Sequence, residues 1–161
     1  MTINTIPGVS GTDELTTLLG TEVADLFNVE ENNIYIDGLE GNDTIVAATG
    51  VEGLYIETGV NNDTVSFTAE VLTSRLNLAE GNDKVTITDF SGTIYGGSGN
   101  DTIDAGSGND IINGEAGNDT ISTGLGIDII TMAGNEDGDI ISDFTKGVDI
   151  LILTGTALGN L

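Results

Sequence analysis

The chain of 161 residues contains no cysteine, no histidine and no tryptophan, and it has a single proline. Without cysteine there are no disulfides, no thiolate metal ligands and no cysteine nucleophile. Without histidine there is no zinc site built on imidazoles and no Ser-His-Asp triad. The chain therefore lacks the side chains on which many metal sites and hydrolases depend.

Positive charge is also scarce. Lysine and arginine together number 3 against 27 acidic residues, so the formal net charge is −24. Only Arg75, Lys84, Lys146 and the amino terminus carry positive charge, which leaves no patch that could neutralise phosphates or anionic lipid. The composition excludes nucleic acid as a partner and predicts a cation instead.

Targeting and membrane segments are missing from the sequence. The first twenty residues have neither a basic region nor a continuous apolar run, so no N-terminal signal peptide is predicted. No segment is long and apolar enough to span a bilayer, and we expect no membrane insertion. Taken alone, these two absences favour a cytoplasmic location.

A nine-residue motif occurs four times in tandem between Gly96 and Thr131. Its glycines allow positive φ, the asparagine before the aspartate tolerates the left-handed region, and the apolar residue two places after the aspartate lies in a β-favouring trio. Each unit therefore predicts a six-residue turn followed by a short strand. The four units are GGSGNDTID, AGSGNDIIN, GEAGNDTIS and TGLGIDIIT.

This pattern is that of the calcium-binding nonapeptide, and on these residues the chain resembles the RTX (repeats-in-toxin) hemolysin-type calcium-binding repeat proteins. The resemblance implies an all-β fold, a right-handed parallel β-roll (β-solenoid) of about seven coils with calcium-binding turns. Calcium is then the expected cofactor and partner.

A longer period of 18 or 20 residues, which corresponds to one coil, becomes visible when the aspartates are aligned. Two columns of apolar residues accompany these aspartates, and we expect them to face each other across a thin core. The roll is predicted over residues 18–139, after an N-terminal cap or mobile segment (1–17) and before C-terminal capping strands and a tail (140–161). The aspartates are Asp25, Asp43, Asp63, Asp83, Asp101 and Asp119; the columns are Phe27, Ile45, Val65, Val85, Ile103, Ile121 and Leu18, Ile36, Ile56, Leu76, Ile94, Ile112.

The resemblance implies that each calcium ion lies between successive turns on the same edge of the roll, where carbonyls and the repeat aspartates provide oxygen ligands. No catalytic residue and no organic cofactor are expected. The predicted metal-site residues on the first edge are Asp43, Asp63, Asp83, Gly96, Gly97, Gly99, Asp101, Gly114, Gly117 and Asp119, and on the second edge Gly106, Gly108, Asp110, Gly126 and Asp128.

A column of aspartates one strand spacing apart is unstable without cations. At about 4.8 Å and an effective dielectric near 20, each neighbouring pair repels by roughly 3–4 kcal/mol. Because net domain stability is only about 5–15 kcal/mol, we expect a disordered metal-free chain that folds on binding calcium. Charge count and loop exposure suggest affinities on the order of 10⁻⁴–10⁻³ M, as in extracellular modules. The resemblance adds a type I secretion route, so the predicted location is extracellular.

The end of the repeats is less regular. Asp139 follows Asp119 by twenty residues, and we expect one more coil with Met132 and Ile141 in the two columns. The strand Val148–Leu153 is apolar on both faces, which suits either a capping strand covered on two sides or an exposed edge.

The leading functional hypothesis is a secreted structural protein, with self-assembly head to tail into fibres or a surface layer through Val148–Leu153. An adhesin or carbohydrate-binding module is the alternative. Tyr35, Tyr55 and Tyr95 point outward at matching places and could bind a flat partner or a sugar, although packing along the sheet also explains such a row. An enzyme acting on polysaccharide is the least favoured reading, because Arg75 and Lys84 are its only cationic candidates.

Overall fold

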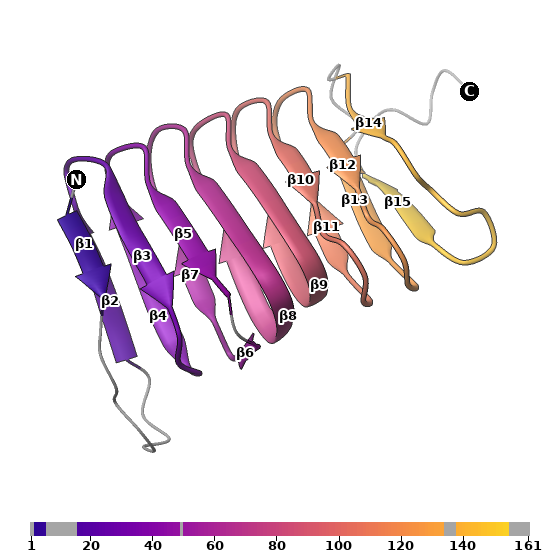
Figure 1. Cartoon of the computed structure of the whole chain (residues 1–161). Helices are drawn as coiled ribbons and strands as arrows, with labels where there is room; N and C mark the ends of the chain where they lie inside the picture. The colour runs from indigo at the N-terminus through magenta and orange to yellow at the C-terminus, as the bar shows by residue number, and fades with distance from the viewer. Residues whose placement is uncertain (1, 6–15, 49, 134–137, 155–161) are drawn as a thin grey trace.

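The computed structural model describes residues 2–5, 16–48, 50–133 and 138–154. Within these ranges the chain consists of strands and turns, with no helix that could span a membrane. The strands stack into a flattened rod (Figure 1). They are β1 (Thr2–Thr5), β2 (Thr16–Thr21), β3 (Asp25–Val29), β4 (Ile34–Leu39), β5 (Thr44–Ala47), β6 (Val51–Glu52), β7 (Tyr55–Glu57), β8 (Thr64–Asn77), β9 (Lys84–Tyr95), β10 (Thr102–Asp104), β11 (Ile111–Asn113), β12 (Thr120–Ser122), β13 (Ile129–Ala133), β14 (Ile140–Ile141) and β15 (Ile150–Thr154).

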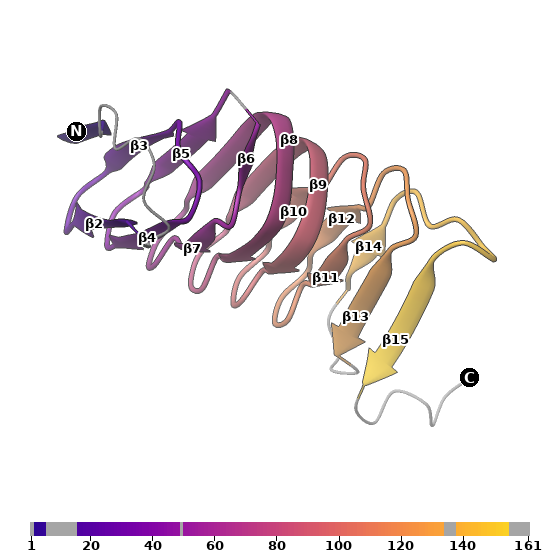
Figure 2. The same cartoon turned by 90° about the horizontal axis from the view of Figure 1, so that it is seen from below.

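All strand pairs are parallel, and they form two walls. The first wall runs in the order β1-β3-β5-β8-β9-β10-β12-β14, and the second in the order β2-β4-β7-β8-β9-β11-β13-β15. The long strands β8 and β9 belong to both walls because they curve around one edge of the rod (Figure 2). The predicted all-β solenoid of about seven coils is confirmed.

Both predicted apolar columns are present in the register of the walls. In the first wall Phe27 pairs with Ile45, and the column continues through Val65, Val85 and Ile103 to Ile121. In the second wall the column from Leu18 to Ile112 is equally continuous. Every member of the two columns is buried, so the core is a thin double layer between the walls.

The last coil corrects one prediction. Ile141 continues the first column, as expected, by pairing with Ile121. In the second wall, however, Ile130 pairs with Ile112 and is fully buried, whereas Met132 lies two residues further along the strand and is only partly covered. The reason is that the fourth nonapeptide keeps the nine-residue spacing, and the insertion comes only after it.

The two ends of the rod differ. At the N-terminal end β1 pairs with β3, and most of the predicted cap, residues 6–15, lies outside the described residues. At the C-terminal end β15 is exposed along its whole length, as the exposed-edge alternative for this strand requires. The tail after Thr154, where a secretion signal was considered, also lies outside the described residues.

Candidate metal centre: the aspartate columns

The aspartates of the first edge form one hydrogen-bonded column. The backbone N–H of each aspartate donates to Oδ1 of the aspartate one coil later, at 2.7–2.9 Å. The column holds Asp25, Asp43, Asp63, Asp83, Asp101, Asp119 and Asp139, all buried except the half-buried Asp139. The turns therefore stack with their carboxylates pointing inward, in the order predicted from the 18- and 20-residue spacings.

The second oxygen of most of these carboxylates has no hydrogen-bond donor. Oδ2 is buried and without a hydrogen bond in Asp43, Asp63, Asp83 and Asp101 of this column. On the opposite edge the same holds for Oδ2 of Asp128 and for both oxygens of Asp110. A buried carboxylate oxygen without a partner costs free energy, and the cost is removed by a cation or by a proton. The column therefore presents a line of oxygen ligands.

Backbone carbonyls converge on the same places. A methyl group built on Gly96, the first residue of its turn, would lie 2.5 Å from the carbonyl oxygen of Gly114 and 2.6 Å from Oδ2 of Asp101. At Gly38 the equivalent methyl would meet the carbonyl of Thr58 and lie 2.5 Å from Oδ2 of Asp43. Carboxylate and carbonyl oxygens around a space kept open by glycine are the donor set that calcium prefers.

This space is not the same in every turn. In the two coils that follow the Gly38 turn, the first turn position is occupied by Thr58 and Leu78, whose side chains are buried. The Thr58 hydroxyl donates to the Leu78 carbonyl at 2.6 Å, so that carbonyl already has a partner. Within the described residues no three acidic side chains gather at one point, so any ion must depend on carbonyls as well as aspartates. The residues present therefore fit calcium best at Asp43 and Asp101.

The second edge carries a shorter column. Asp110 N–H donates to Oδ1 of Asp128 at 2.9 Å, and Asp128 N–H donates to Oδ1 of Asp149 at 3.3 Å. Asp149 is buried and was missed by the sequence analysis, which placed it on the strand Val148–Leu153. The sequence signal that could have identified Asp149 is its spacing of 21 residues from Asp128, which is close to the length of one coil. In earlier coils this edge is crossed by the continuous strands β8 and β9.

Burial changes the protonation of these carboxylates in the metal-free fold. It raises the pKa of Asp63 and of Asp83 to about 7 and that of Asp101 to about 6. Burial, together with the Asp128 carboxylate, raises the pKa of Asp110 to about 8. In the absence of a cation, each of these carboxylates takes up a proton when the pH falls below its raised pKa, and it is a buried anion above that pH.

Acidification should therefore favour folding of the metal-free chain. An unfolded aspartate titrates near pH 3.9, so between about pH 4 and pH 8 the folded state binds more protons than the unfolded state. The stability of the metal-free roll is then greatest near pH 4 and falls as the pH rises to about 8. Far-UV circular dichroism in chelator should show more β-structure at pH 4 than at pH 8. An unchanged spectrum would contradict the proton-binding columns.

Asparagines form a second ladder that the sequence analysis missed. Asn100 N–H donates to Oδ1 of Asn82 at 2.7 Å, so this ladder runs opposite to the aspartate ladder. Although asparagine tolerates the left-handed region, positive φ occurs in these turns at the second and fourth positions, such as Gly97 and Gly99. Other asparagines that accept in this way are Asn42, Asn62, Asn100, Asn109 and Asn118. The sequence signal for this ladder was the recurrence of asparagine immediately before the repeat aspartate.

The chain's own donors satisfy a carboxylate near the C-terminal end. Asp143 accepts hydrogen bonds from the N–H groups of Thr123 and Gly124, both at 2.9 Å, and from the Ser122 hydroxyl at 2.8 Å. Burial by itself would raise the pKa of Asp143, but these hydrogen bonds outweigh it and hold the pKa below its usual value. This carboxylate is stabilised as an anion without a metal.

Replacing Asp143 should destabilise the calcium-loaded roll. Asp143→Asn places an amide NH₂ among three donors, and we expect the free energy of unfolding to fall by about 2–3 kcal/mol. Asp104→Asn is the matched control, because Asp104 is exposed on β10. Urea unfolding in saturating calcium measures both changes. Equal stabilities of the two variants would contradict the capping role.

A row of aromatic rings crosses the outer face of the second wall. Tyr35 and Tyr55 lie 5.4 Å apart between ring centroids. The Arg75 guanidinium lies 5.5 Å from the Tyr55 ring and 4.6 Å from the Tyr95 ring. The three tyrosines are half-buried and point outward, as expected.

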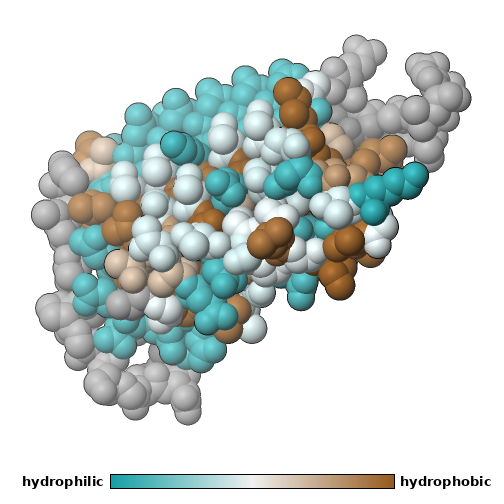
Figure 3. Space-filling view, turned by 45° about the vertical axis from the view of Figure 1, so that its right-hand side comes forward, coloured by the Kyte–Doolittle hydropathy of each residue, from teal (hydrophilic) through white to brown (hydrophobic). Residues whose placement is uncertain are grey.

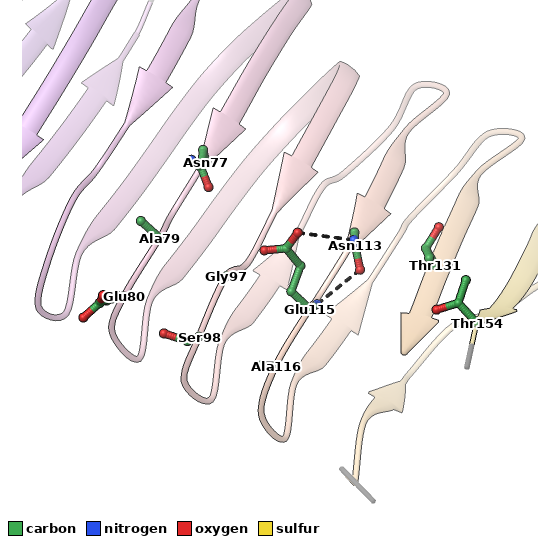
Figure 4. A pocket seen from close by; sticks show the side chains of 10 residues that line it. All are labelled: Asn77, Ala79, Glu80, Gly97, Ser98, Asn113, Glu115, Ala116, Thr131 and Thr154. Carbon is green, nitrogen blue, oxygen red and sulfur yellow. Dashed lines mark hydrogen bonds between the residues drawn. The ribbon is translucent and has the colours of Figure 1, made fainter. Parts of the chain in front are cut away.

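Next to this row is an open groove of about 600 Å³ (Figure 4). Its lining is amide, hydroxyl, carboxylate and small side chains. Within one turn of this lining, the Asn113 amide donates to the Glu115 carboxylate at 3.5 Å and the Glu115 N–H donates to Asn113 Oδ1 at 3.2 Å. The residues that line it are Asn77, Ala79, Glu80, Gly97, Ser98, Asn113, Glu115, Ala116, Thr131 and Thr154.

Fold and site together define a parallel β-roll whose glycine turns present columns of buried aspartates. The model of the RTX calcium-binding nonapeptide repeat matches the chain in four copies, over residues 35–51 and 93–130. Over these residues the chain matches the RTX calcium-binding repeat, which confirms the resemblance and implies calcium binding. No curated protein and no solved structure matches the chain.

Proposed function

We propose that the protein is a calcium-binding structural β-roll, in which ions lie between successive turns of the two aspartate columns. The observation that carries the proposal is the set of buried carboxylate oxygens without hydrogen bonds, aligned with carbonyls of the next coil. The proposed ligand residues are those predicted from the sequence: the aspartates at 43, 63, 83, 101 and 119 on the first edge and at 110 and 128 on the second, with their turn glycines.

Calcium content tests this assignment directly. Because the expected affinities are on the order of 10⁻⁴–10⁻³ M, the protein must stay in equilibrium with millimolar calcium during the measurement. Elemental analysis of the protein compartment against its dialysate, at high ionic strength, should then show several bound calcium ions per chain. Asp110→Asn should remove only the ion of the second edge, because Asp110 and Asp128 form a separate column. Retention of no calcium would end the proposal.

Secretion belongs to the same proposal. The calcium affinities expected for such turns are filled at extracellular and not at cytosolic calcium levels. A chain with 27 acidic residues that remains unfolded at low calcium suits export in an unfolded state, and RTX repeat proteins are generally secreted by type I systems. Recovery of the protein in the medium only when a type I exporter is co-expressed would support this location; retention in the cells would contradict it.

We further propose a structural and not a catalytic role. The two cations considered for an enzyme, Arg75 and Lys84, lie in different walls of the rod, paired with Tyr55 and Thr64 respectively. Arg75 is moreover stacked on two tyrosine rings. Arg75 and Lys84 therefore do not form a common cationic site.

A carbohydrate-binding module is the second candidate, supported by the groove beside the tyrosine row. Amides and hydroxyls such as those of Asn77, Asn113 and Thr131 suit sugar hydroxyls. The ring nearest to them in the sheet is that of Tyr95, which pairs with both Asn77 and Asn113 and offers a stacking face. Affinity electrophoresis in gels containing neutral polysaccharides tests it. Retardation that Asn113→Ala abolishes would support this candidate, and unaltered migration in every gel would exclude it.

A further inference from the structure

The strand at the C-terminal end of the second wall has a partner on one side only. Within the described residues β15 pairs with β13, from Ile129↔Ile150 to Ala133↔Thr154, and with no other strand. Its sequence, ILILT, carries no charge. An unpaired strand edge of this kind is a template for pairing with another chain, and natural proteins usually protect it with charges or proline.

The same strand leaves apolar surface uncovered on both faces. Leu151 is the last member of the second core column and is 40% exposed, although its neighbour Ile130 is 0% exposed. Ile150 and Ile152 on the outer face are 50% and 43% exposed. Hydrophobic residues gather at this end of the rod (Figure 3). Contiguous exposed apolar surface of this kind marks an interaction site.

Among the described residues, the N-terminal end of the rod does not offer a matching surface. Leu18, the first member of the same column, is 7% exposed, so the core is already covered there. Head-to-tail stacking would place the apolar C-terminal end against a covered one. In the part of the chain that the structure describes, β15 of a second copy is the surface that combines an unpaired strand edge with exposed apolar side chains on both faces.

Charge also selects this end for self-association. With a net charge of −24, two copies repel each other over most of their surface. At the C-terminal end, by contrast, β15 is uncharged, Asp149 is buried, and the exposed Lys146 is one of the chain's three basic side chains.

We propose that two copies of the folded chain associate through their C-terminal ends, with the β15 strands antiparallel across a two-fold axis. With this axis the inner faces of the two β15 strands lie on the same side of the joined sheet. Leu151 and Leu153 of one copy then lie beside those of the partner and close the core. The contact is isologous and self-limiting, and it gives a dimer instead of an open filament. The dimer rests on the proposed calcium-dependent folding, because β15 is part of the folded roll.

Sedimentation velocity of the full chain in saturating calcium tests the dimer across a range of protein concentrations, with circular dichroism on the same samples. The expected species has twice the monomer mass of 16.5 kDa. Ile152→Glu, on the outer face of β15, should weaken the dimer at least tenfold without changing the spectrum. Leu19→Glu is the control: Leu19 is exposed at the opposite end, and this substitution should leave the dimer intact.

Three results would overturn the dimer. Species that keep growing with concentration and that Leu19→Glu abolishes would mean head-to-tail filaments. A folded monomer at all concentrations would mean that β15 is covered by the chain's own C-terminal residues or stays exposed, and calcium-dependent folding would still stand. A chain that calcium does not fold would instead refute the proposed function itself.

Discussion

Asp101→Asn should raise the calcium concentration required for folding by roughly ten- to a hundredfold. Asp101 contributes to the columns in two ways: Oδ1 accepts the Asp83 N–H at 2.8 Å, while Oδ2 is buried without a hydrogen bond beside the Gly114 carbonyl. Asparagine keeps an oxygen that can accept the Asp83 N–H, but it removes the negative charge that binds calcium at Oδ2.

The same substitution should have the opposite effect in chelator. Without calcium the Asp101 carboxylate is a buried anion next to Asp119, and its removal relieves both burial and repulsion. Asp101→Asn should therefore contain more β-structure than the parent chain in chelator at pH 8, although it needs more calcium to fold completely. Circular dichroism at both limits measures this reversal. A variant that is destabilised equally with and without calcium would show that Asp101 is only a turn former.

Asp83→Asn provides an internal comparison. Asp83 has the same ladder hydrogen bond, but the first position of its turn is the buried Leu78 in place of glycine. We expect a smaller shift in the calcium requirement than for Asp101→Asn. Asp104→Asn, on the exposed face of β10, should cause none.

Gly99→Ala should cost about 3 kcal/mol or more of the calcium-loaded stability. Gly99 has φ +127°, a conformation that disfavours any Cβ, and a methyl group there would run into the carbonyl oxygen of Gly81 in the preceding coil. Both atoms belong to backbone held by the ladder, so neither can move away cheaply. A loss of this size is a large part of the total stability of a small domain.

Gly50→Ala is the matched control for this prediction. Gly50 is exposed, and the nearest atom to its added methyl, the Glu70 carbonyl oxygen, would be 3.6 Å away, an ordinary contact. Urea unfolding in saturating calcium should separate the two variants clearly. Equal free energies of unfolding would mean that the close stacking of turns at Gly99 is not required.

The fold could be predicted from the sequence because a solenoid repeats the same local choice. An apolar residue two places after each aspartate, and another seven places before it, must face the core in every coil, so counting from one aspartate locates all the others. The argument failed where the count changes. After the fourth nonapeptide the insertion misplaced Met132, and Ile130 occupies the core position.

The candidate site was predictable for the repeat aspartates and less so for the residues around them. Asp149 follows a turn without the glycine pattern, and only the folded chain shows that it continues the column of Asp110 and Asp128. The asparagine ladder and the hydrogen bonds to Asp143 depend on contacts between coils, which local propensity does not contain. Thr58 and Leu78 stand where other turns begin with glycine. Their effect, such as the hydrogen bond from the Thr58 hydroxyl to the Leu78 carbonyl, likewise depends on contacts between coils.

A calcium titration of the chelated protein at pH 8, followed by far-UV circular dichroism and repeated with magnesium, tests the central claim most directly. We expect a transition from a disordered spectrum to a β-rich one near millimolar calcium, and no transition with magnesium, which demands a stricter octahedral geometry and dehydrates reluctantly. A chain that is already β-rich in chelator and does not respond to calcium would contradict the account, since its buried aspartates would then be stable without any cation.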